Sequence, residues 1–307
     1  MRDENDTIRT LSVPEELEEL RCDRFLSEEL PEYSRTYLQK LFGEGRVEVS
    51  GKTIKGSRKM KTGELVSVRI PAPEELKALP EDIPLSILYE DEELLIVNKP
   101  KGMVVHPAPG NLSGTLVNAV LFHCRDELSG INGVLRPGIV HRIDKNTTGS
   151  LIVCKTDAAH RLIAGQLKDH SIHRLYRGIV CGRIAEDSFT VEGNIGRDQR
   201  DRKKMTVVRE GGKPALTHGR VLERFRNYTY CEFRLETGRT HQIRVHMAHI
   251  GHPLLGDDVY GPKKCPFSLE GQTLHAMTIG FVHPGTKEYV EFSAPLPDYF
   301  KDLLRIL

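Results

Sequence analysis

The 307-residue sequence is poor in cysteine, in long apolar runs and in net charge, and each shortage excludes a class of protein. The six cysteines are scattered without a Cys-x-x-Cys pair, which argues against a disulfide framework and against a zinc ribbon. No apolar run approaches the roughly 20 residues that cross a bilayer. The polar segment 1–6 also lacks the apolar core of a signal peptide. We therefore expect a reduced, cytoplasmic protein without a membrane segment.

The net charge of +1 gives no global argument for nucleic-acid binding, but the charges are unevenly distributed. Residues 1–20 contain 2 basic and 7 acidic side chains, whereas residues 21–70 contain 11 basic and 7 acidic ones. A second basic segment, Asn194 to Arg209, contains Arg197, Arg200, Arg202, Lys203, Lys204 and Arg209. Segregated basic surface is what binding to a phosphate backbone requires. Most charge runs are nevertheless ordinary solvated faces, so this feature is supporting evidence only.

The sequence pattern divides the chain into a small amino-terminal part and a large carboxyl-terminal part. Residues 1–16 are expected to form a disordered acidic tail and residues 17–71 a compact unit. In that unit Asp23 is expected to cap one helix and Ser34 a second, followed by strands near 47–49, 53–54 and 65–70. Prolines punctuate the following stretch, so residues 72–83 are predicted to link this unit to a domain at 84–307.

In the larger part, the spacing of apolar residues predicts helices at 115–123, 157–168 and 299–306, and a further helix capped by Thr240. Strands are predicted at 85–89, 94–97, 138–140, 150–154, 176–180, 221–225, 228–235 and 289–293. Because strands and helices do not alternate regularly, the sequence favours an α+β fold over a doubly wound one. We expect a mixed, mainly antiparallel sheet with flanking helices.

The most informative stretch is GIVHRIDKNTTG, residues 138–149. The apolar segment 138–140 leads directly into His141, Arg142, Asp144 and Lys145. Strand ends that feed loops are where rigid scaffolds hold reactive groups. A carboxylate flanked by cations can also stay ionised in a partly buried place. Taken alone, these residues fit an ordinary strand and polar turn equally well.

Two further motifs have a similar logic. In ETGRTHQIRVH, residues 236–246, a strand ends, a glycine turn follows and a helix begins. A helix amino terminus offers free amides to phosphate or carboxylate, although a well-capped surface helix is the plainer interpretation. NKPKGMVVHP, residues 98–107, is a rigid basic turn between apolar segments.

Together these motifs resemble those of the RluA/RluD family of RNA pseudouridine synthases. HRIDKNTTG at residues 141–149 is similar to the family's catalytic motif, written HRLDxxTSG, and HRLYRGIVCG at 173–182 to the strand that carries its tyrosine. Residues 17–71 resemble the S-four-like RNA-binding domain that precedes the catalytic domain in many members. The departures from the family pattern spare the Asp, Tyr and Arg of these motifs and are Ile143, Asn146, Thr148, Ser150 and Ser50.

The resemblance implies that Asp144 is the catalytic carboxylate, Arg244 its ion-pair partner and Tyr176 the ring that stacks on a flipped uracil. Whether Asp144 attacks the sugar or removes a sugar proton stays open. Arg142 would fill the space that the flipped base leaves, or contact phosphate. Further RNA contacts are expected from His141, Lys145, Arg239, Ser34, Arg35 and Arg46. The reaction needs neither water nor a redox change, so no metal, nucleotide or other cofactor is expected.

The implied substrate is structured RNA, with large-subunit ribosomal RNA as the expected partner of a monomeric enzyme. One alternative is a non-catalytic RNA-binding ribosome-assembly factor on the same fold. Another is a nucleoside or glycoside hydrolase, although glycoside hydrolysis usually needs two carboxylates across the bond. A metal site is disfavoured because His241, His246, His249 and His252 lack a metal-binding spacing. The Cys-x-x-Cys of zinc deaminases and the GK[ST] of a phosphate loop are absent as well.

Overall fold

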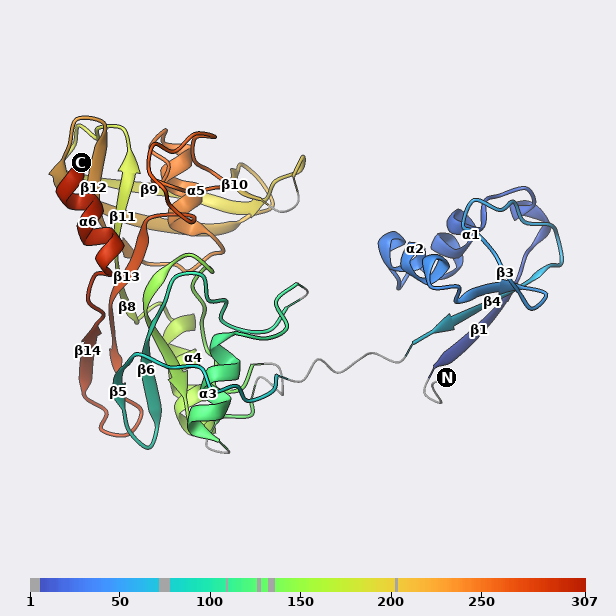
Figure 1. Ribbon diagram of the computed structural model, residues 1–307, viewed down its shortest axis with the longest axis horizontal. Helices are drawn as coiled ribbons and strands as arrows, with labels where there is room; N and C mark the ends of the chain where they lie inside the picture. The colour runs from blue at the N-terminus through green and yellow to red at the C-terminus, as the bar shows by residue number, and fades with distance from the viewer. Residues whose placement is uncertain (1–5, 72–77, 109, 126–127, 132–135, 202–203) are drawn as a thin grey trace. The chain divides into compact units, whose positions relative to one another are not determined.

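The computed structural model describes residues 6–71, 78–108, 110–125, 128–131, 136–201 and 204–307. It divides the chain into two compact units, Met1–Glu75 and Leu76–Leu307 (Figure 1). The predicted linker at 72–83 contains residues 72–77, which lie outside the described residues, and the described part, 78–83, has no regular secondary structure.

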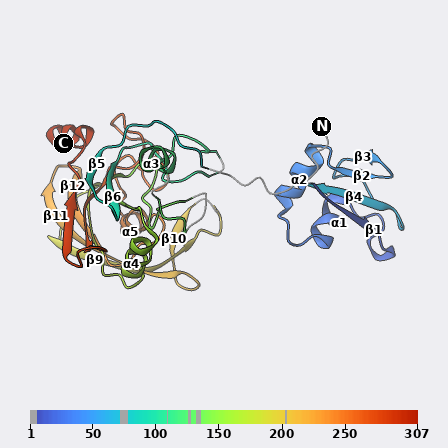
Figure 2. The ribbon, with the colours of Figure 1, turned by 90° about the horizontal axis from the view of Figure 1, so that it is seen from below.

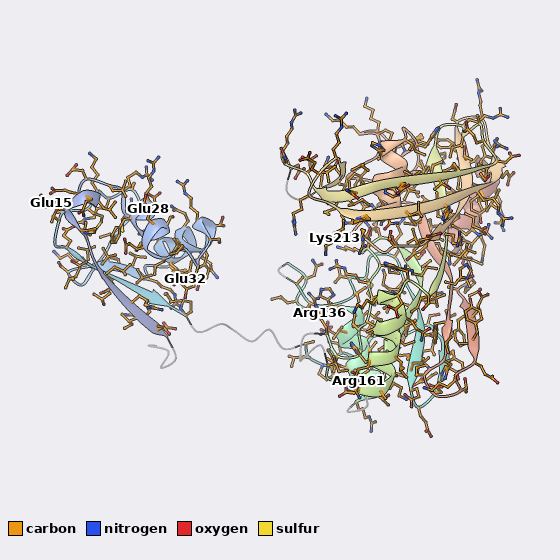
Figure 3. The ribbon with its side chains drawn as sticks, turned by 180° about the vertical axis from the view of Figure 1, so that it is seen from behind. Glu15, Glu28, Glu32, Arg136, Arg161 and Lys213 are labelled. Atoms are coloured by element: carbon orange, nitrogen blue, oxygen red, sulfur yellow. The ribbon has the colours of Figure 1, made fainter. Side chains whose placement is uncertain are left out.

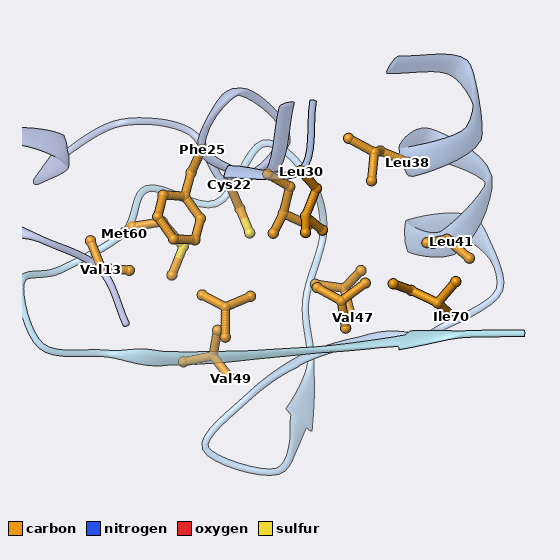
Figure 4. Packing of buried hydrophobic residues seen from close by; sticks show 13 residues of the cluster. Val13, Cys22, Phe25, Leu30, Leu38, Leu41, Val47, Val49, Met60 and Ile70 are labelled. Atoms are coloured by element: carbon orange, nitrogen blue, oxygen red, sulfur yellow. The ribbon is translucent and has the colours of Figure 1, made fainter. Parts of the chain in front are cut away.

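The small unit packs two helices on a four-stranded antiparallel sheet. Its strands follow the order β1 (Thr7–Ser12), β4 (Leu65–Ile70), β2 (Val47–Val49) and β3 (Lys52–Thr53). The short 3-10 helix η1 (Glu15–Leu17) precedes α1 (Cys22–Glu29) and α2 (Arg35–Gly43). Figure 4 shows how Phe25, Leu38 and Leu41 from the helices meet Val47 and Val49 from the sheet. This apolar cluster lets the small unit form a core of its own.

Two expectations for the small unit are wrong. The predicted acidic tail contains β1, which pairs with β4 from Thr7↔Ile70 to Ser12↔Leu65. Its side chains are mostly exposed, so backbone pairing with the edge of β4 holds it and no hydrophobic pattern reveals it. Asp23 does not cap α1, which begins one residue earlier. Instead its buried carboxylate accepts hydrogen bonds from Arg21 and Gln39. The predicted cap of α2 is confirmed, since Ser34 Oγ accepts from Tyr37 N at 3.3 Å.

The large unit is built on one mixed sheet. Its order is β10 (Met205–Val208), β9 (Ser188–Arg197), β11 (Lys213–Arg224), β12 (Tyr228–Leu235), β8 (His173–Cys181), β13 (Leu274–Val282), β7 (Thr148–Cys154), β6 (Leu94–Lys99) and β5 (Ile87–Glu90). Strand β14 (Tyr289–Ser293) also pairs with β13. Among the described strands, β7 and β13 run parallel, at two residue pairs, and the other neighbours are antiparallel. The predicted α+β fold with a mainly antiparallel sheet is confirmed.

Helices cover both faces of this sheet (Figure 2). On β6 and β7, neighbouring residues alternate between a cluster containing α3 (Leu116–Cys124) and one containing α4 (Asp157–Lys168). On β8, Val180 packs in the cluster of α5 (Gln242–His249), and Ile179 in that of α6 (Asp298–Ile306). Tyr176 touches the clusters of both α3 and α5, so these two helices share one face. The motif residues gather on that face.

Other differences from the predicted elements concern the sheet. The predicted strand at 138–140 is wrong: Ile139 makes one isolated bridge to Val153, and the rest of this segment and the following loop are irregular. Strands β9, β10 and β13 were not predicted, and β11 begins well before the predicted 221. Among the described residues, no helix is both long and apolar enough to span a membrane.

Candidate active site

Asp144 lies in an irregular loop that leads into β7, and several contacts fix this loop. Ile143 is buried in the core beside Asp144. Thr147 N donates to the carbonyl of Asp144 at 3.0 Å, and Thr147 Oγ1 accepts from Gln272 Nε2 at 2.9 Å. The carbonyl of Lys145 accepts from Gly102 N at 3.0 Å. Asp144 is therefore held on a rigid loop and not on a freely moving one.

Lys99 connects the basic turn NKPKG to this loop. Its side chain is 0% exposed, and Nζ donates to the carbonyls of Pro100 and Met103 at 2.8 Å and of Lys145 at 3.0 Å. Three carbonyls match the three N–H groups of an ammonium. Burial lowers the pKa of Lys99 to about 7, although the nearby charge of Asp144 acts in the opposite direction. The NKPKG motif thus has a structural part in shaping the loop that carries Asp144.

Arg244, in the first turn of α5, connects two carboxylates. Its Nη1 donates to Asp144 Oδ2 at 3.1 Å, while Nε and Nη2 donate to the two oxygens of Asp257 at 2.7 and 2.9 Å. Asp257 also accepts from the backbone amides of Val259 and Tyr260, both at 2.9 Å. Burial alone would lower the pKa of Arg244, but hydrogen bonds and charge from Asp257 and Asp144 raise it. The guanidinium is therefore a permanent cation.

The amino terminus of α5 is not built as predicted. Thr240 does not cap this helix; the residue before it is His241, in the left-handed conformation with φ 57° and ψ 21°. The buried amide of Gln242 holds the turn, because its Oε1 accepts from Thr237 Oγ1 and Arg239 N at 2.8 and 2.9 Å. A left-handed conformation of a residue other than glycine is costly and clusters at functional sites.

His241 lies beside Asp144. Its Nε2 is 3.7 Å from Asp144 Oδ1, and its Nδ1 is 2.9 Å from Tyr260 Oη. Tyr260 packs against Arg244, with the guanidinium carbon 5.1 Å from the ring centre. The amide of Met205 on β10 donates to the same Tyr260 Oη at 2.9 Å. Tyr260 therefore joins the start of α5 to the β9–β10 hairpin.

A pocket opens over Asp144. Its walls are formed by Arg142, Ile143, Asp144, Thr147, Tyr176, Leu235, Arg239, His241, Gln242, Ile243, Arg244 and Leu274. Tyr176 on β8 supplies an aromatic ring, and burial raises the pKa of its phenol. The Asp144 side chain remains 20% exposed, so a molecule in the pocket can reach it. A pocket with one aromatic ring, one carboxylate and several cations suits a planar ring attached to an anionic chain.

The structure distributes the other predicted RNA contacts unevenly. Arg142, Lys145 and Arg239 are exposed or partly exposed near the pocket, and Arg239 Nε donates to Pro214 O at 2.9 Å. His141 differs, because its Nε2 accepts from the amide of Ile152 on β7 at 3.0 Å. Burial lowers the pKa of His141 to about 3, so it offers no positive charge to phosphate. Its described contact holds the loop against β7.

In the small unit, Ser34 and Arg35 are exposed at the start of α2, and the Arg35 side chain is 69% exposed. Arg46 forms ion pairs within the small unit, since it donates to Asp6 at 2.7 Å and to Glu44 at 3.0 Å. Its charge is thus neutralised within the unit. In the basic segment 194–209, Arg202 and Lys203 lie outside the described residues.

The four histidines of the carboxyl-terminal region do not converge. His246 Nδ1 is 3.0 Å from Thr217 Oγ1, and His252 Nδ1 is 2.9 Å from the carbonyl of Cys181. With His241 bound to Tyr260, three of the four rings have separate partners in the described structure.

Residues 93–249, which carry Asp144, Tyr176 and Arg244, match the model of the family described as RNA pseudouridylate synthase. This chain belongs to that family. It is an RNA pseudouridine synthase of the RluA/RluD type, and therefore an isomerase.

Relatives that align with nearly the whole chain are also named as pseudouridine synthases. The chain is 52% identical to the uncharacterized RNA pseudouridine synthase YlyB of Bacillus subtilis, over 97% of both chains. It is 47% identical to the ribosomal large subunit pseudouridine synthase D of Zymomonas mobilis, over 97% of this chain and 96% of that one. Among solved structures, human RNA pseudouridylate synthase domain containing 1 aligns with a TM-score of 0.58 at 26% identity. That alignment covers 74% of this chain and 86% of the human one.

Sequence reasoning missed several residues that shape the site of this pseudouridine synthase. Lys99 stands in the NKPKG motif, but only its burial reveals its structural role. Asp257 and Tyr260 lie in an irregular segment, where no periodicity marks them. Gln242 stands in the ETGRTHQIRVH motif, where its neighbour Thr240 was the expected cap. A useful signal for Asp257 would have been the buried arginine, since a guanidinium that faces a single exposed carboxylate needs a second partner.

Proposed function

We propose that this synthase isomerises specific uridines in large-subunit ribosomal RNA, with Asp144 as the catalytic carboxylate acting on a flipped uridine. The observation that carries the proposal is the environment of Asp144. It is the partly exposed carboxylate in the pocket, Arg244 holds one of its oxygens, and Tyr176 lies in the same wall.

The neighbouring carboxylate supports this assignment. Asp257 is 0% exposed and accepts four N–H groups, two from Arg244 and two from the backbone. It is therefore not available as the second working carboxylate of a glycoside hydrolase. Asp144 is the one carboxylate among the lining residues of the pocket, which suits an isomerisation in which the bond from N1 to C1′ breaks and a bond from C5 to C1′ forms. The proton on C5 then leaves and N1 gains one, so the reaction is balanced without water.

The pocket also favours an extruded base. A uridine inside a stem cannot bring its sugar to a carboxylate in the lining of a pocket, so the nucleotide must leave its stack. Tyr176 offers a ring face to the uracil, and Arg142 is exposed at the pocket, where it can take the vacated place or contact phosphate.

Basic groups extend the site along an RNA strand. Arg239 lines both the Asp144 pocket and a second hollow, which Lys213 also lines. Lys213 lies at the start of β11 (Figure 3). Two hollows that share an arginine suit two nucleotides joined by a phosphate. The names of relatives, such as the ribosomal large subunit pseudouridine synthase D of Zymomonas mobilis, favour large-subunit ribosomal RNA. Ser34 and Arg35 of the small unit would add contacts to phosphate.

The test uses transcripts that carry tritium on C5 of uracil. The purified full-length protein is incubated with large-subunit rRNA, small-subunit rRNA and tRNA transcripts, and tritium released to water is counted. Asp144→Asn removes the charge with little change in shape. Asp302→Asn, at an exposed aspartate of α6, is the matched control. We expect release from large-subunit rRNA by the wild type and the control, and none by Asp144→Asn although it still binds RNA.

Each other outcome overturns a defined part of the proposal. Release by Asp144→Asn at the wild-type rate would remove Asp144 from the chemistry. Release from tRNA alone would refute the ribosomal substrate. RNA binding without release on any transcript would favour the assembly-factor alternative, and free uracil in the products would show a hydrolase.

A further inference from the structure

The hydroxyl of Tyr260 determines which nitrogen of His241 carries a proton. Tyr260 Oη accepts the N–H of Met205, and its second neighbour is His241 Nδ1, both at 2.9 Å. Within the described residues it has no other hydrogen-bond partner. Because the carboxylate of Asp144 faces His241 Nε2, a proton on Nε2 suits that neighbour, and the phenolic hydroxyl of Tyr260 is then free to donate to Nδ1. In neutral His241 the proton is then on Nε2.

That proton is directed at the carboxylate of Asp144. His241 Nε2 lies 3.7 Å from Asp144 Oδ1, while Arg244 occupies Oδ2. The distance is longer than a hydrogen bond. Contacts of this kind in a substrate-free site commonly shorten when the reactive complex forms. The left-handed backbone of His241 maintains this direction at an energetic cost.

We propose that His241, fixed by Tyr260 as its Nε2–H tautomer, is a positioning residue that orients Asp144 Oδ1 toward the sugar of the target uridine. This inference rests on the proposed role of Asp144. A neutral donor on Oδ1 orients this oxygen without the full ion pair that would weaken it as a nucleophile or base. Arg244 keeps the carboxylate charged through Oδ2, so the two oxygens have different tasks.

The surroundings of His241 keep the ring neutral. Burial lowers its pKa, and the cations Arg244 and Arg142 act in the same direction. Asp144 and Asp257 act in the opposite direction. Tyr260 adds a further obstacle, because a proton on Nδ1 would turn the phenolic hydrogen away from the acceptor that it has among the described residues. The hydroxyl of Tyr260 thus opposes formation of the imidazolium, which would pair with Asp144.

The first test compares His241→Leu with His241→Gln in the tritium-release assay. The amide nitrogen of glutamine can replace the Nε2–H donor, whereas leucine cannot. We expect kcat to fall about 10- to 100-fold in His241→Leu with little change in KM, as for a small misplacement of a reactive group. His241→Gln should recover most of the loss. Circular dichroism and RNA binding establish that each variant is folded.

The second test uses Tyr260→Phe, which keeps the ring on Arg244 and removes the hydroxyl. Because the obstacle to protonation is gone, we expect the pKa of His241 to rise. The part of the acid limb of kcat that His241 contributes should therefore move to higher pH, and that part should be missing in His241→Gln. Tyr289→Phe, at an exposed tyrosine of β14, is the control and should leave the profile unchanged.

The outcomes separate this inference from the proposed function. If Asp144→Asn is inactive while folded His241→Leu keeps kcat within twofold of the wild type, the role of His241 is refuted and that of Asp144 stands. An unchanged acid limb in Tyr260→Phe would likewise refute the part assigned to the tyrosine. If Asp144→Asn releases tritium at the wild-type rate, the proposed role of Asp144 fails, and this inference fails with it.

Discussion

Asp257→Asn tests whether the buried arginine is the structural centre of the site. The carboxylate of Asp257 accepts four N–H groups, two of them from Arg244, and is 0% exposed. Asparagine has one oxygen, so its amide group must face at least one of these donors. Removing one partner of a buried ion pair costs about 3–5 kcal/mol, because the other charge stays buried. We expect a loss of about 3 kcal/mol, since the oxygen of asparagine keeps some of the bonds.

For a unit of this size, 1 kcal/mol corresponds to about 2–4 °C in melting temperature. Calorimetry of the full chain should therefore show the transition of the large unit lowered by about 6–12 °C at pH 7. Catalytic activity should fall as well, because Arg244 would no longer be held against Asp144. Asp258→Asn is the matched control: its carboxylate is 68% exposed and 3.7 Å from Arg244, so the variant should lose no more than about 1 kcal/mol.

The pH dependence gives a second check. Burial alone would raise the pKa of Asp257, but Arg244 and the backbone amides lower it below its ordinary value. A carboxyl of this kind stabilises the fold above the ordinary pKa near 4 and loses that effect as the pH falls through its lowered folded value. The difference in melting temperature between the wild type and Asp257→Asn should therefore become smaller below about pH 4. A difference in melting temperature at pH 7 no larger than that of Asp258→Asn would refute the reasoning.

Three further predictions concern other parts of the chain. Gly149→Ala should cost about 3 kcal/mol or more in a urea titration, because φ is 110° and a Cβ would overlap the carbonyl of Ala276 on β13. Lys99→Met should destabilise the fold. Because burial lowers the pKa of Lys99 to about 7, the free energy of unfolding of the wild type should rise above pH 7 by up to about 1.4 kcal/mol per pH unit relative to this variant. A difference in unfolding free energy that does not change with pH would contradict this. In the small unit, the hydrogen bond from Arg58 lowers the pKa of Glu64 to about 2. Glu64→Gln should therefore speed hydrogen exchange of the β4 amides at neutral pH, to an extent that corresponds to a loss of about 1 kcal/mol in opening free energy. That difference should be full above about pH 4.3 and vanish as the pH falls through about 2.

Elements with a local signal could be predicted from the sequence. Helix α4 was predicted at 157–168 and is found at Asp157–Lys168, where Thr156 caps it and the apolar spacing is regular. Strands β12 and β14 also agree with their predicted ranges. Strand β13 could not be predicted in this way: it is buried on both faces for much of its length, so no alternation marks it.

In the candidate site too, residues in local motifs could be predicted, and residues that depend on tertiary structure could not. Asp144, Tyr176 and Arg244 stand in dense motifs, and the resemblance to a known family assigned them roles. The structure then brings Asp144 and Arg244, 100 positions apart, to 3.1 Å. Asp257 and Tyr260 depend on how an irregular segment folds back over Arg244, which no local pattern records. Thr240 looked like a cap, but Gln242 reaches more partners and holds that turn.

The parallel pairing of β7 with β13 has a consequence for the order of folding. Strand β7 ends at Cys154, but its partner begins at Leu274, and the two share only the pairs His275↔Thr148 and Ala276↔Gly149. Pairing across so long a loop has a high entropic cost, and it must wait until β13 has been made. Gln272, which holds the Asp144 loop through Thr147, arrives with that same part. A nascent chain therefore has every motif before it has the residues that hold the Asp144 loop in place.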